Sequence, residues 1–139
     1  MEFKTSSDVV YSCKYPIVWC PKYRRKVLVD EAAVRLEGII RETAYEKQVE
    51  IIEMEITPAL AAGASVPDHV HLLCEIHPQY GVHLFVRLVK GRSSRLLRQE
   101  YKSLRTRLPT LWTNSYFIST VGGAPLEIIK QYIENQKRV

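Results

Sequence analysis

The sequence predicts an α+β protein in which an antiparallel sheet carries helices on one face. Its predicted elements run in the order β-α-β-β-α-β and are followed by one more helix. The first six match the split β-α-β pattern of ferredoxin-like (RRM-like) folds. Segment 69–77 alternates as a strand does, whereas 30–47 and 82–101 carry apolar residues at helical spacing. The third strand is internal in this topology, so its outward side chains would stand in the middle of the open sheet face.

In the first half of the chain, a strand is predicted over 11–20. Pro16 places the start of its regular part near Ile17, because proline lacks a backbone N–H. The clearest helix follows over 30–47. The next strand, 49–56, alternates apolar and acidic residues, with one face made of Ile52, Met54 and Ile56 and the other of Glu53 and Glu55.

The strand at 69–77 carries the first candidate site. Successive side chains on a strand point to opposite faces. Here one face holds His69, His71, Leu73, Glu75 and His77, and the other holds Val70, Leu72, Cys74 and Ile76. The second face is wholly apolar, so it should pack on the core and leave both histidines on the opposite surface. The same parity argues against a zinc cluster, because Cys74 would point away from the histidines and His77 is too distant.

In the second half, the predicted helix 82–101 has an apolar stripe with basic residues opposite it. Gly91 marks either a break in this helix or a point of close packing. A strand over 115–121 then completes the sheet. The connection between the second and third strands, from Thr57 to Asp68, is long for a hairpin.

A final helix, predicted to run from Pro125 to about Lys137, carries the second candidate site. Tyr132 and Gln136 lie four residues apart, so their side chains can reach one target together. Gly122 and Gly123 precede the helix and form a flexible joint.

Composition bounds the kind of protein. The chain has 139 residues and no linker or repeat, which predicts one domain over 1–139. Three cysteines without motif spacing argue against a disulfide framework. The N-terminal residues lack the pattern of a signal peptide, and no apolar stretch reaches membrane-spanning length. We therefore expect a soluble cytoplasmic protein.

The net charge of +5 is concentrated in two basic clusters. The candidate DNA-contacting residues are Lys22, Tyr23, Arg24, Arg25, Lys26, Arg87, Lys90, Arg92, Arg95 and Arg98. Such clusters suit a polyanion, but solvated basic surfaces that serve solubility fit the charge equally well. The aromatic ring among them could stack on an unpaired base or lie at the rim of the core.

These residue types suit metal-assisted phosphoryl transfer. A phenol can act as a nucleophile, and a metal would help it because its ordinary pKa is about 10. His69 and His71 would be two ligands and Gln136 a third. All three are neutral, so a hard cation such as Mg²⁺ or Mn²⁺ would bind weakly without DNA. Taken singly, each residue has a simpler interpretation, since strand histidines and helix tyrosines are more often packing residues.

Two strings, Pro67-Asp68-His69-Val70-His71-Leu72-Leu73 and Gln131-Tyr132-Ile133-Glu134-Asn135-Gln136, closely resemble the signatures of TnpA-type single-tyrosine transposases. These belong to the HUH nuclease superfamily and are encoded by minimal bacterial and archaeal insertion sequences. Further segments similar to the family, in family order, are 18–24, 88–91, 111–112 and 115–117. The resemblance therefore covers nearly the whole chain.

The resemblance implies roles for matching positions. His69 and His71 would be the HUH metal ligands, Gln136 the remaining ligand, and Tyr132 the nucleophile that becomes linked to the 5′ phosphate. The family acts on single-stranded DNA, recognises hairpins near the ends of the element and works as a homodimer. In that dimer the tyrosine helix of one subunit can complete the histidine site of the other, with Gly122–Gly123 as the pivot.

The sequence departs from the family in one place, because residues 57–65 lengthen the connection that leads into Pro-Asp-His. An extended loop is one explanation; altered strand pairing, which would misplace the histidines, is another. Two other functions stay open. A DNA-binding module of the same fold would form no covalent product, and a related nuclease that nicks replication origins would prefer an origin sequence.

Overall fold

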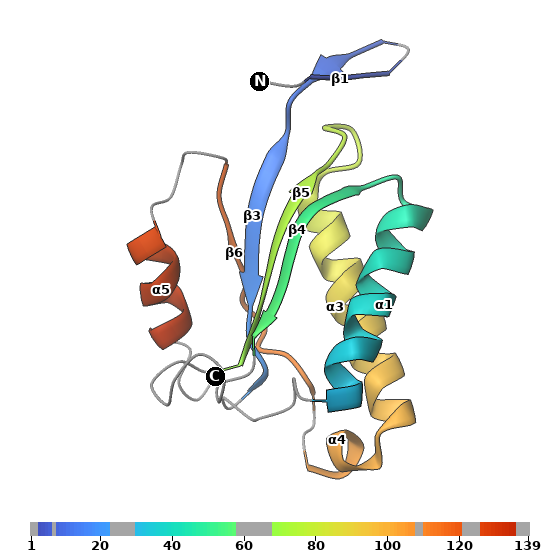
Figure 1. Cartoon of the computed structure of the whole chain (residues 1–139), viewed down its shortest axis with the longest axis vertical. Helices are drawn as coiled ribbons and strands as arrows, with labels where there is room; N and C mark the ends of the chain where they lie inside the picture. The colour runs from blue at the N-terminus through green and yellow to red at the C-terminus, as the bar shows by residue number, and fades with distance from the viewer. Residues whose placement is uncertain are drawn as a thin grey trace.

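The structure, a computed structural model, describes residues 3–6, 8–22, 30–57, 68–107, 110–120 and 126–135. A four-stranded antiparallel sheet forms its centre, with helices on both faces (Figure 1). The strands are β3 (Lys14–Trp19), β4 (Glu50–Thr57), β5 (His69–Glu75) and β6 (Phe117–Ile118), in the order β4-β5-β3-β6. The α+β class is confirmed, and the histidine strand β5 is internal, as the sequence predicts.

The helices form two layers (Figure 1). They are α1 (Asp30–Glu46), α3 (Val82–Glu100), the short α4 (Lys102–Arg107) and α5 (Leu126–Asn135). Helices α1 and α3 pack together on one face of the sheet, and α5 lies on the other. Both long helices end within one residue of their predicted bounds, because their apolar residues recur with the helical period. The core includes Ile17, Trp19, Leu36, Ile40, Val70, Leu72, Phe85 and Val89.

Local structure differs from the prediction in three parts of the chain: β3 with the segment before it, β4, and α3 with β6. Strand β3 begins at Lys14 and contains Pro16, which lies opposite Leu73 of β5. The Ser119 N–H donates to the Pro16 carbonyl at 3.1 Å, so the missing proline N–H faces the β6 side, where the partner strand ends at Ile118. The β5 ladder is therefore not interrupted. A short hairpin of β1 (Lys4–Thr5) and β2 (Val10–Tyr11), absent from the prediction, precedes it.

The second correction concerns β4. A register shift between Ile51 and Glu53 changes which side chains face the core, so Ile51 pairs with Cys74 while Ile52 remains exposed. A β-bulge has this effect because it adds one residue to one strand only. Beyond the bulge the pairing is regular as far as Thr57, which lies opposite His69. Pairing next to the lengthened connection is thus intact, although residues 58–67 lie outside the described part.

The third correction concerns α3 and β6. Helix α3 continues through Gly91, and apart from the adjoining residues and backbone of the helix itself, no heavy atom of the described residues lies within 4 Å of the position that a Cβ would take there. The glycine is therefore neither a break nor a close packing point. Strand β6 has two residues rather than the predicted seven, because the segment before it is bound by side chains, as described below, and position 121 is not described. No helix in the described ranges is long and apolar enough to cross a membrane.

Candidate active site

The two histidines of β5 lie on the sheet face opposite α1 and α3. Val70, Leu72 and Cys74 are fully buried in the core, while His69 and His71 are half-buried. The predicted alternation of side chains between the two faces of β5 is thus confirmed, and Cys74 cannot share a metal with the histidines. Its burial also raises the pKa of its thiol to about 12.

One residue on the histidine face is not open to solvent. Glu75 is 3% exposed; its carboxylate accepts a hydrogen bond from the Cys13 backbone N–H and lies 4.0 Å from Lys14 Nζ. His77 follows the end of β5 and contacts the N-terminal hairpin, with its Nε2 3.2 Å from Ser6 Oγ and its ring 4.8 Å from that of Tyr11. The histidine pair therefore stands apart from His77, as the sequence predicts.

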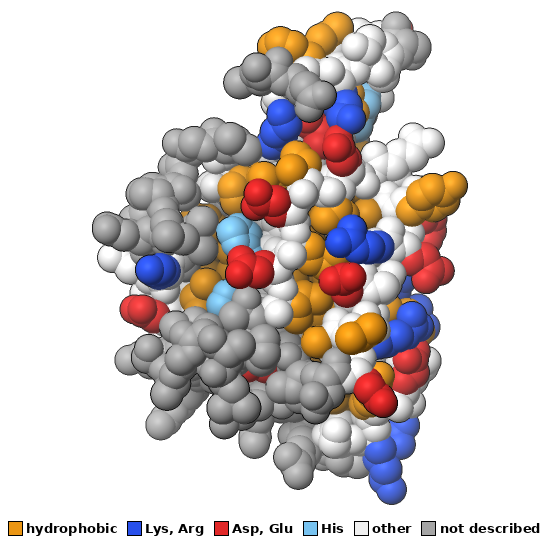
Figure 2. Space-filling view, viewed as in Figure 1, with side chains coloured by type: hydrophobic (Ala, Val, Ile, Leu, Met, Phe, Trp, Pro, Cys, Tyr) orange, Lys and Arg blue, Asp and Glu red, His pale blue; other side chains and the backbone are white. Residues whose placement is uncertain are grey.

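Charged neighbours of the histidine pair suit a cation. Register places Glu55 of β4 directly opposite His71, and Glu53 and Glu55 line a shallow depression beside His71. Figure 2 shows acidic and histidine side chains next to one another in this view. Burial lowers the pKa of His71 and His69 lowers it further, whereas Glu55 and Glu53 raise it. The net lowering favours the neutral imidazole, which is the form that binds metals.

The donor set that the structure describes is incomplete. Within the described ranges, no group of three or more His, Cys, Asp or Glu side chains is arranged to hold a metal ion. His69 and His71 fit a metal site by residue type and shared face, but two ligands do not complete one, so a further ligand is needed. Gln136, the predicted third ligand, lies outside the described residues, as do Gly122 and Gly123.

Tyr132 lies on the same sheet face as the histidines. Its hydroxyl is 3.0 Å from Ser115 Oγ and its ring centroid is 5.6 Å from that of Phe117. It packs with Ile133 against a small apolar cluster that contains Val18 of β3, and Val18 lies opposite His71. Helix α5 therefore brings the phenol to the histidine face, as an amphipathic helix with one buried stripe should.

The distance between the two halves of the site is set by β3. Ser115 precedes β6, and β6 and β5 pair with opposite edges of β3, so about 10 Å separates their backbones. The phenol is half-buried in this arrangement. Burial raises the pKa of Tyr132, hydrogen bonds from Ser115 and Thr113 lower it, and Cys20 raises it. The site thus consists of a hydrogen-bonded phenol and two imidazoles on one sheet face, with strand β3 between them.

Comparison with known proteins identifies the family. The family model described as "Transposase IS200 like" matches residues 9–136. The chain belongs to the IS200-like transposases. It is 38% identical over 138 residues to the ISDra2 transposase TnpA of Deinococcus radiodurans, covering 98% of this chain and 92% of that protein. It is 32% identical over 135 residues to the transposase for insertion sequence element IS200 of Salmonella typhimurium, covering 96% of this chain and 82% of that protein.

Solved structures support the fold of this IS200-like transposase. A crystal structure described as a transposase from Deinococcus radiodurans R1 has a TM-score of 0.80 and 34% identity, covering 98% of this chain and 99% of that one. A REP-associated tyrosine transposase bound to a REP hairpin has a TM-score of 0.57 and 12% identity, covering 93% and 68%. The second likeness is one of fold alone. The family places the protein among enzymes of DNA transposition.

The predicted DNA contacts of this transposase remain predictions. Residues 23–26 lie outside the described part, and Lys22 donates its backbone N–H to the Leu111 carbonyl. Arg87 and Arg95 are exposed and Arg98 is half-buried. Two of the candidates use their charges within the chain: Arg92 pairs with Glu46 at 2.8 Å, and Lys90 donates to main-chain carbonyls.

Sequence reasoning missed two residues at the phenol, Thr113 and Ser115. Neither belongs to a catalytic motif, and 17 positions separate Ser115 from Tyr132, so no local spacing connects them. The available signal was that Ser115 begins one of the segments that resemble the family.

Proposed function

We propose that this transposase cleaves and rejoins single-stranded DNA at the ends of an insertion sequence through a covalent 5′-phosphotyrosine at Tyr132. The observation that carries the proposal is that Tyr132 and the histidine pair share one sheet face and are separated by a single strand. On this proposal the scissile phosphodiester would lie between the phenol and the imidazoles. An appended tyrosine helix on a ferredoxin-like sheet is the scaffold that we infer for this chemistry.

The bond changes in this reaction balance without a co-substrate. The Tyr132 hydroxyl oxygen forms a bond to phosphorus, the bond from phosphorus to the 3′ oxygen breaks, and the phenol proton ends on the departing 3′ hydroxyl. In the second step another 3′ hydroxyl attacks the phosphotyrosine and releases the phenol. Because one phosphodiester is exchanged for another, strands can be rejoined without ATP.

The residues that would hold a divalent metal, Mg²⁺ or Mn²⁺, are His69, His71 and Gln136. When bound, such an ion would polarise the phosphoryl oxygens and stabilise the charge that develops on them. Three neutral ligands hold a hard cation weakly, so the substrate phosphate should contribute to binding. Glu55 opposite His71 adds negative charge beside this position.

The substrate that we infer is single-stranded DNA with hairpins near the ends of the element, bound by a homodimer. The exposed guanidinium groups of Arg87 and Arg95 on α3 support a polyanionic ligand. Residues 22–26 would extend the basic surface. Gly122–Gly123 would be the pivot on which α5 moves.

A covalent-adduct assay tests this function. The protein is incubated with Mg²⁺ or Mn²⁺ and single-stranded oligonucleotides from the ends of the encoding element, then denatured and separated by size. We expect a denaturant-resistant adduct that Tyr132→Phe abolishes. Tyr45→Phe is the matched control, because Tyr45 is 88% exposed on α1. An adduct with Tyr132→Phe would show that another residue is the nucleophile.

Further arms of the assay separate the alternatives. His69→Ala, His71→Ala and EDTA should each suppress the adduct while single-stranded binding persists. Salt-sensitive binding without any adduct would favour a non-catalytic DNA-binding module. Preference for an origin sequence over the element ends would favour an origin-nicking nuclease.

A further inference from the structure

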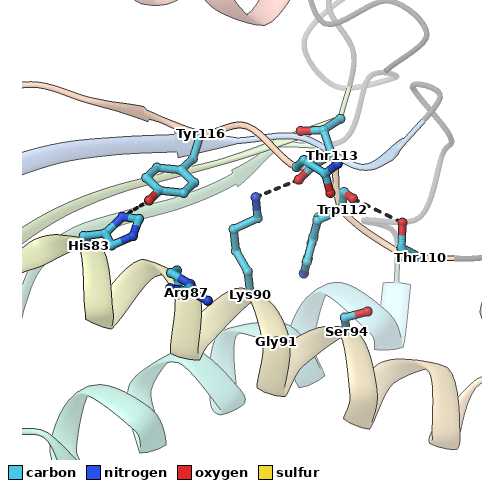
Figure 3. Close-up of a pocket in the computed structure, with 10 residues that line it drawn as sticks. His83, Arg87, Lys90, Gly91, Ser94, Thr110, Trp112, Thr113 and Tyr116 are labelled. Carbon is cyan, nitrogen blue, oxygen red and sulfur yellow. Dashed lines mark hydrogen bonds between the residues drawn. The ribbon is translucent and has the colours of Figure 1, made fainter.

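Lys90, predicted from the sequence to contact DNA, uses its ammonium inside the chain. Its Nζ donates to the carbonyl oxygens of Thr113 at 2.7 Å and Ser115 at 3.0 Å, and it lies 5.1 Å from the centroid of the Tyr116 ring. Figure 3 shows the side chain reaching from α3 across a cleft to the segment that contains Thr113. The ammonium therefore ties helix α3 to residues 113–115, which lie outside the regular strands.

The segment 113–115 is bound on its other side to the active-site face. The Thr113 N–H donates to the Cys20 carbonyl at 3.0 Å, and Thr113 Oγ1 donates to the Ser115 carbonyl at 3.2 Å. Ser115 Oγ then lies 3.0 Å from the Tyr132 hydroxyl. A continuous series of hydrogen bonds thus runs from Lys90 through Ser115 to Tyr132.

The ammonium acts on the same residue whose hydroxyl contacts the phenol. Because Lys90 holds the Ser115 carbonyl, it restricts rotation of that peptide group and so fixes the backbone position from which the Ser115 hydroxyl reaches the phenol. Placing an ammonium where water is partly excluded has a desolvation cost, which a lysine on the open surface would avoid. That cost is expressed in the pKa of Lys90, which burial lowers to about 8.

We propose that Lys90 is a positioning residue for the nucleophile. It fixes the 113–115 segment so that Ser115 holds the Tyr132 hydroxyl on the sheet face that carries the histidines. The proposal rests on the proposed function, in which Tyr132 attacks the phosphate. Lys90 touches neither the phenol nor, on this proposal, the DNA. Its loss should therefore affect the rate of attack rather than the affinity for substrate.

The experiment compares Lys90→Met with Arg105→Met, which removes the same charge from an exposed position on α4. Adduct formation is measured at saturating oligonucleotide. Affinity is measured separately, by titrating the oligonucleotide into Tyr132→Phe and into the double variant that also carries Lys90→Met. For Lys90→Met we expect a rate about 10- to 100-fold lower, since small displacements of reacting groups have effects of this size. The dissociation constant should change less than twofold, and Arg105→Met should preserve the rate.

A spectroscopic measurement on the protein without DNA reports the position of Tyr132 directly. The ¹³Cζ signals of labelled tyrosines are recorded, and the Tyr132 signal is assigned with Tyr132→Phe. We expect Lys90→Met and Ser115→Ala to shift this signal in the same direction, with no shift in Arg105→Met. Ser115→Ala also covers the case in which Lys90→Met fails to fold, because it removes only the last hydrogen bond of the series.

Three results would overturn the inference. An unchanged Tyr132 signal and rate in Lys90→Met would mean that Lys90 does not position the phenol. A large loss of DNA affinity, with a salt slope smaller by about 0.7, would mean that Lys90 contacts a phosphate. A Ser115→Ala variant with the wild-type Tyr132 signal and rate would mean that the hydrogen bond between Ser115 and Tyr132 does not position the phenol. If Tyr132→Phe still forms the adduct, the proposed function fails, while the tyrosine signal still tests the positioning role.

Discussion

Among the described side chains of helix α5, Ile133 and Tyr132 pack against the sheet, and we expect one substitution there to release the helix without unfolding the protein. Ile133 is 6% exposed and packs with Val18 and Cys20, apart from the main core. Ile133→Ala removes three carbons, which at about 0.8 kcal/mol each corresponds to about 2.4 kcal/mol of lost burial. Because 1.4 kcal/mol is tenfold in an equilibrium constant, the undocked population should rise about 50-fold.

Hydrogen exchange measured by mass spectrometry checks this prediction. Peptides from α5 should exchange faster in Ile133→Ala, whereas peptides from β3, β5 and α3 should keep their protection. Val34→Ala, at a position that is 74% exposed on α1, is the control and should change neither. A uniform loss of protection over the whole chain would refute the reasoning, because it would mean that α5 and the main core unfold as one unit.

Two further predictions concern α3. Lys90 has a pKa of about 8 in the folded protein against 10.5 ordinarily, so between pH 8 and 10.5 the unfolded chain binds more protons and the free energy of unfolding should rise with pH. Urea titrations at pH 7 and pH 9.5 should show this rise in the wild type and not in Lys90→Met; equal pH dependence in both would contradict it. Gly91→Ala should stabilise the protein by about 0.5–1 kcal/mol, because the glycine lies inside a helix with space for a Cβ. Urea unfolding measures this as well, and a lower midpoint would mean that the site is crowded.

The parts of the fold that the sequence predicts well are those with a repeating pattern. The faces of β5 follow from strict alternation, and the bounds of α1 and α3 follow from apolar residues at helical spacing. The bulge between Ile51 and Glu53 leaves only a local sign in the sequence, the adjacent apolar residues Ile51 and Ile52, and the regular alternation from Ile52 to Ile56 does not reveal that the register shifts. The two-residue strands β1, β2 and β6 are too short to produce any period.

The candidate site likewise has a part that the sequence predicts and a part that it does not. His69, His71 and Tyr132 lie on one face of the sheet. Parity predicts the shared face of the two histidines, but a helical period does not say on which face of a sheet a helix packs, so the placement of Tyr132 beside them is expected only from the family resemblance. The role of Lys90 could not be predicted, because sequence charge says nothing about which carbonyls a side chain will meet. From the sequence, Lys90 is a candidate DNA contact on the polar face of an amphipathic helix, whereas tertiary packing brings its ammonium to two main-chain acceptors in the cleft.

Docking of α5 on β3 of its own chain leads to a prediction about which subunit supplies the tyrosine. If the docked arrangement is the catalytic one, Tyr132 serves the histidines of the same chain. Tyr132→Phe and His69→Ala subunits mixed together would then form no adduct, since neither has both halves of the site. If α5 instead serves the partner, each mixed dimer contains one intact pair and adduct formation returns.

We expect the first outcome if the contacts of Tyr132 with Ser115 and Phe117 of its own chain are kept in the reacting protein. Recovery of adduct in the mixture would overturn it and would mean that these contacts break before the reaction. Ile133→Ala then gives an internal check: by weakening the docking, it should increase recovery in a system where α5 exchanges between subunits. In a system where each chain acts alone, the same substitution can only reduce adduct formation, because the released phenol loses its position beside the histidine face.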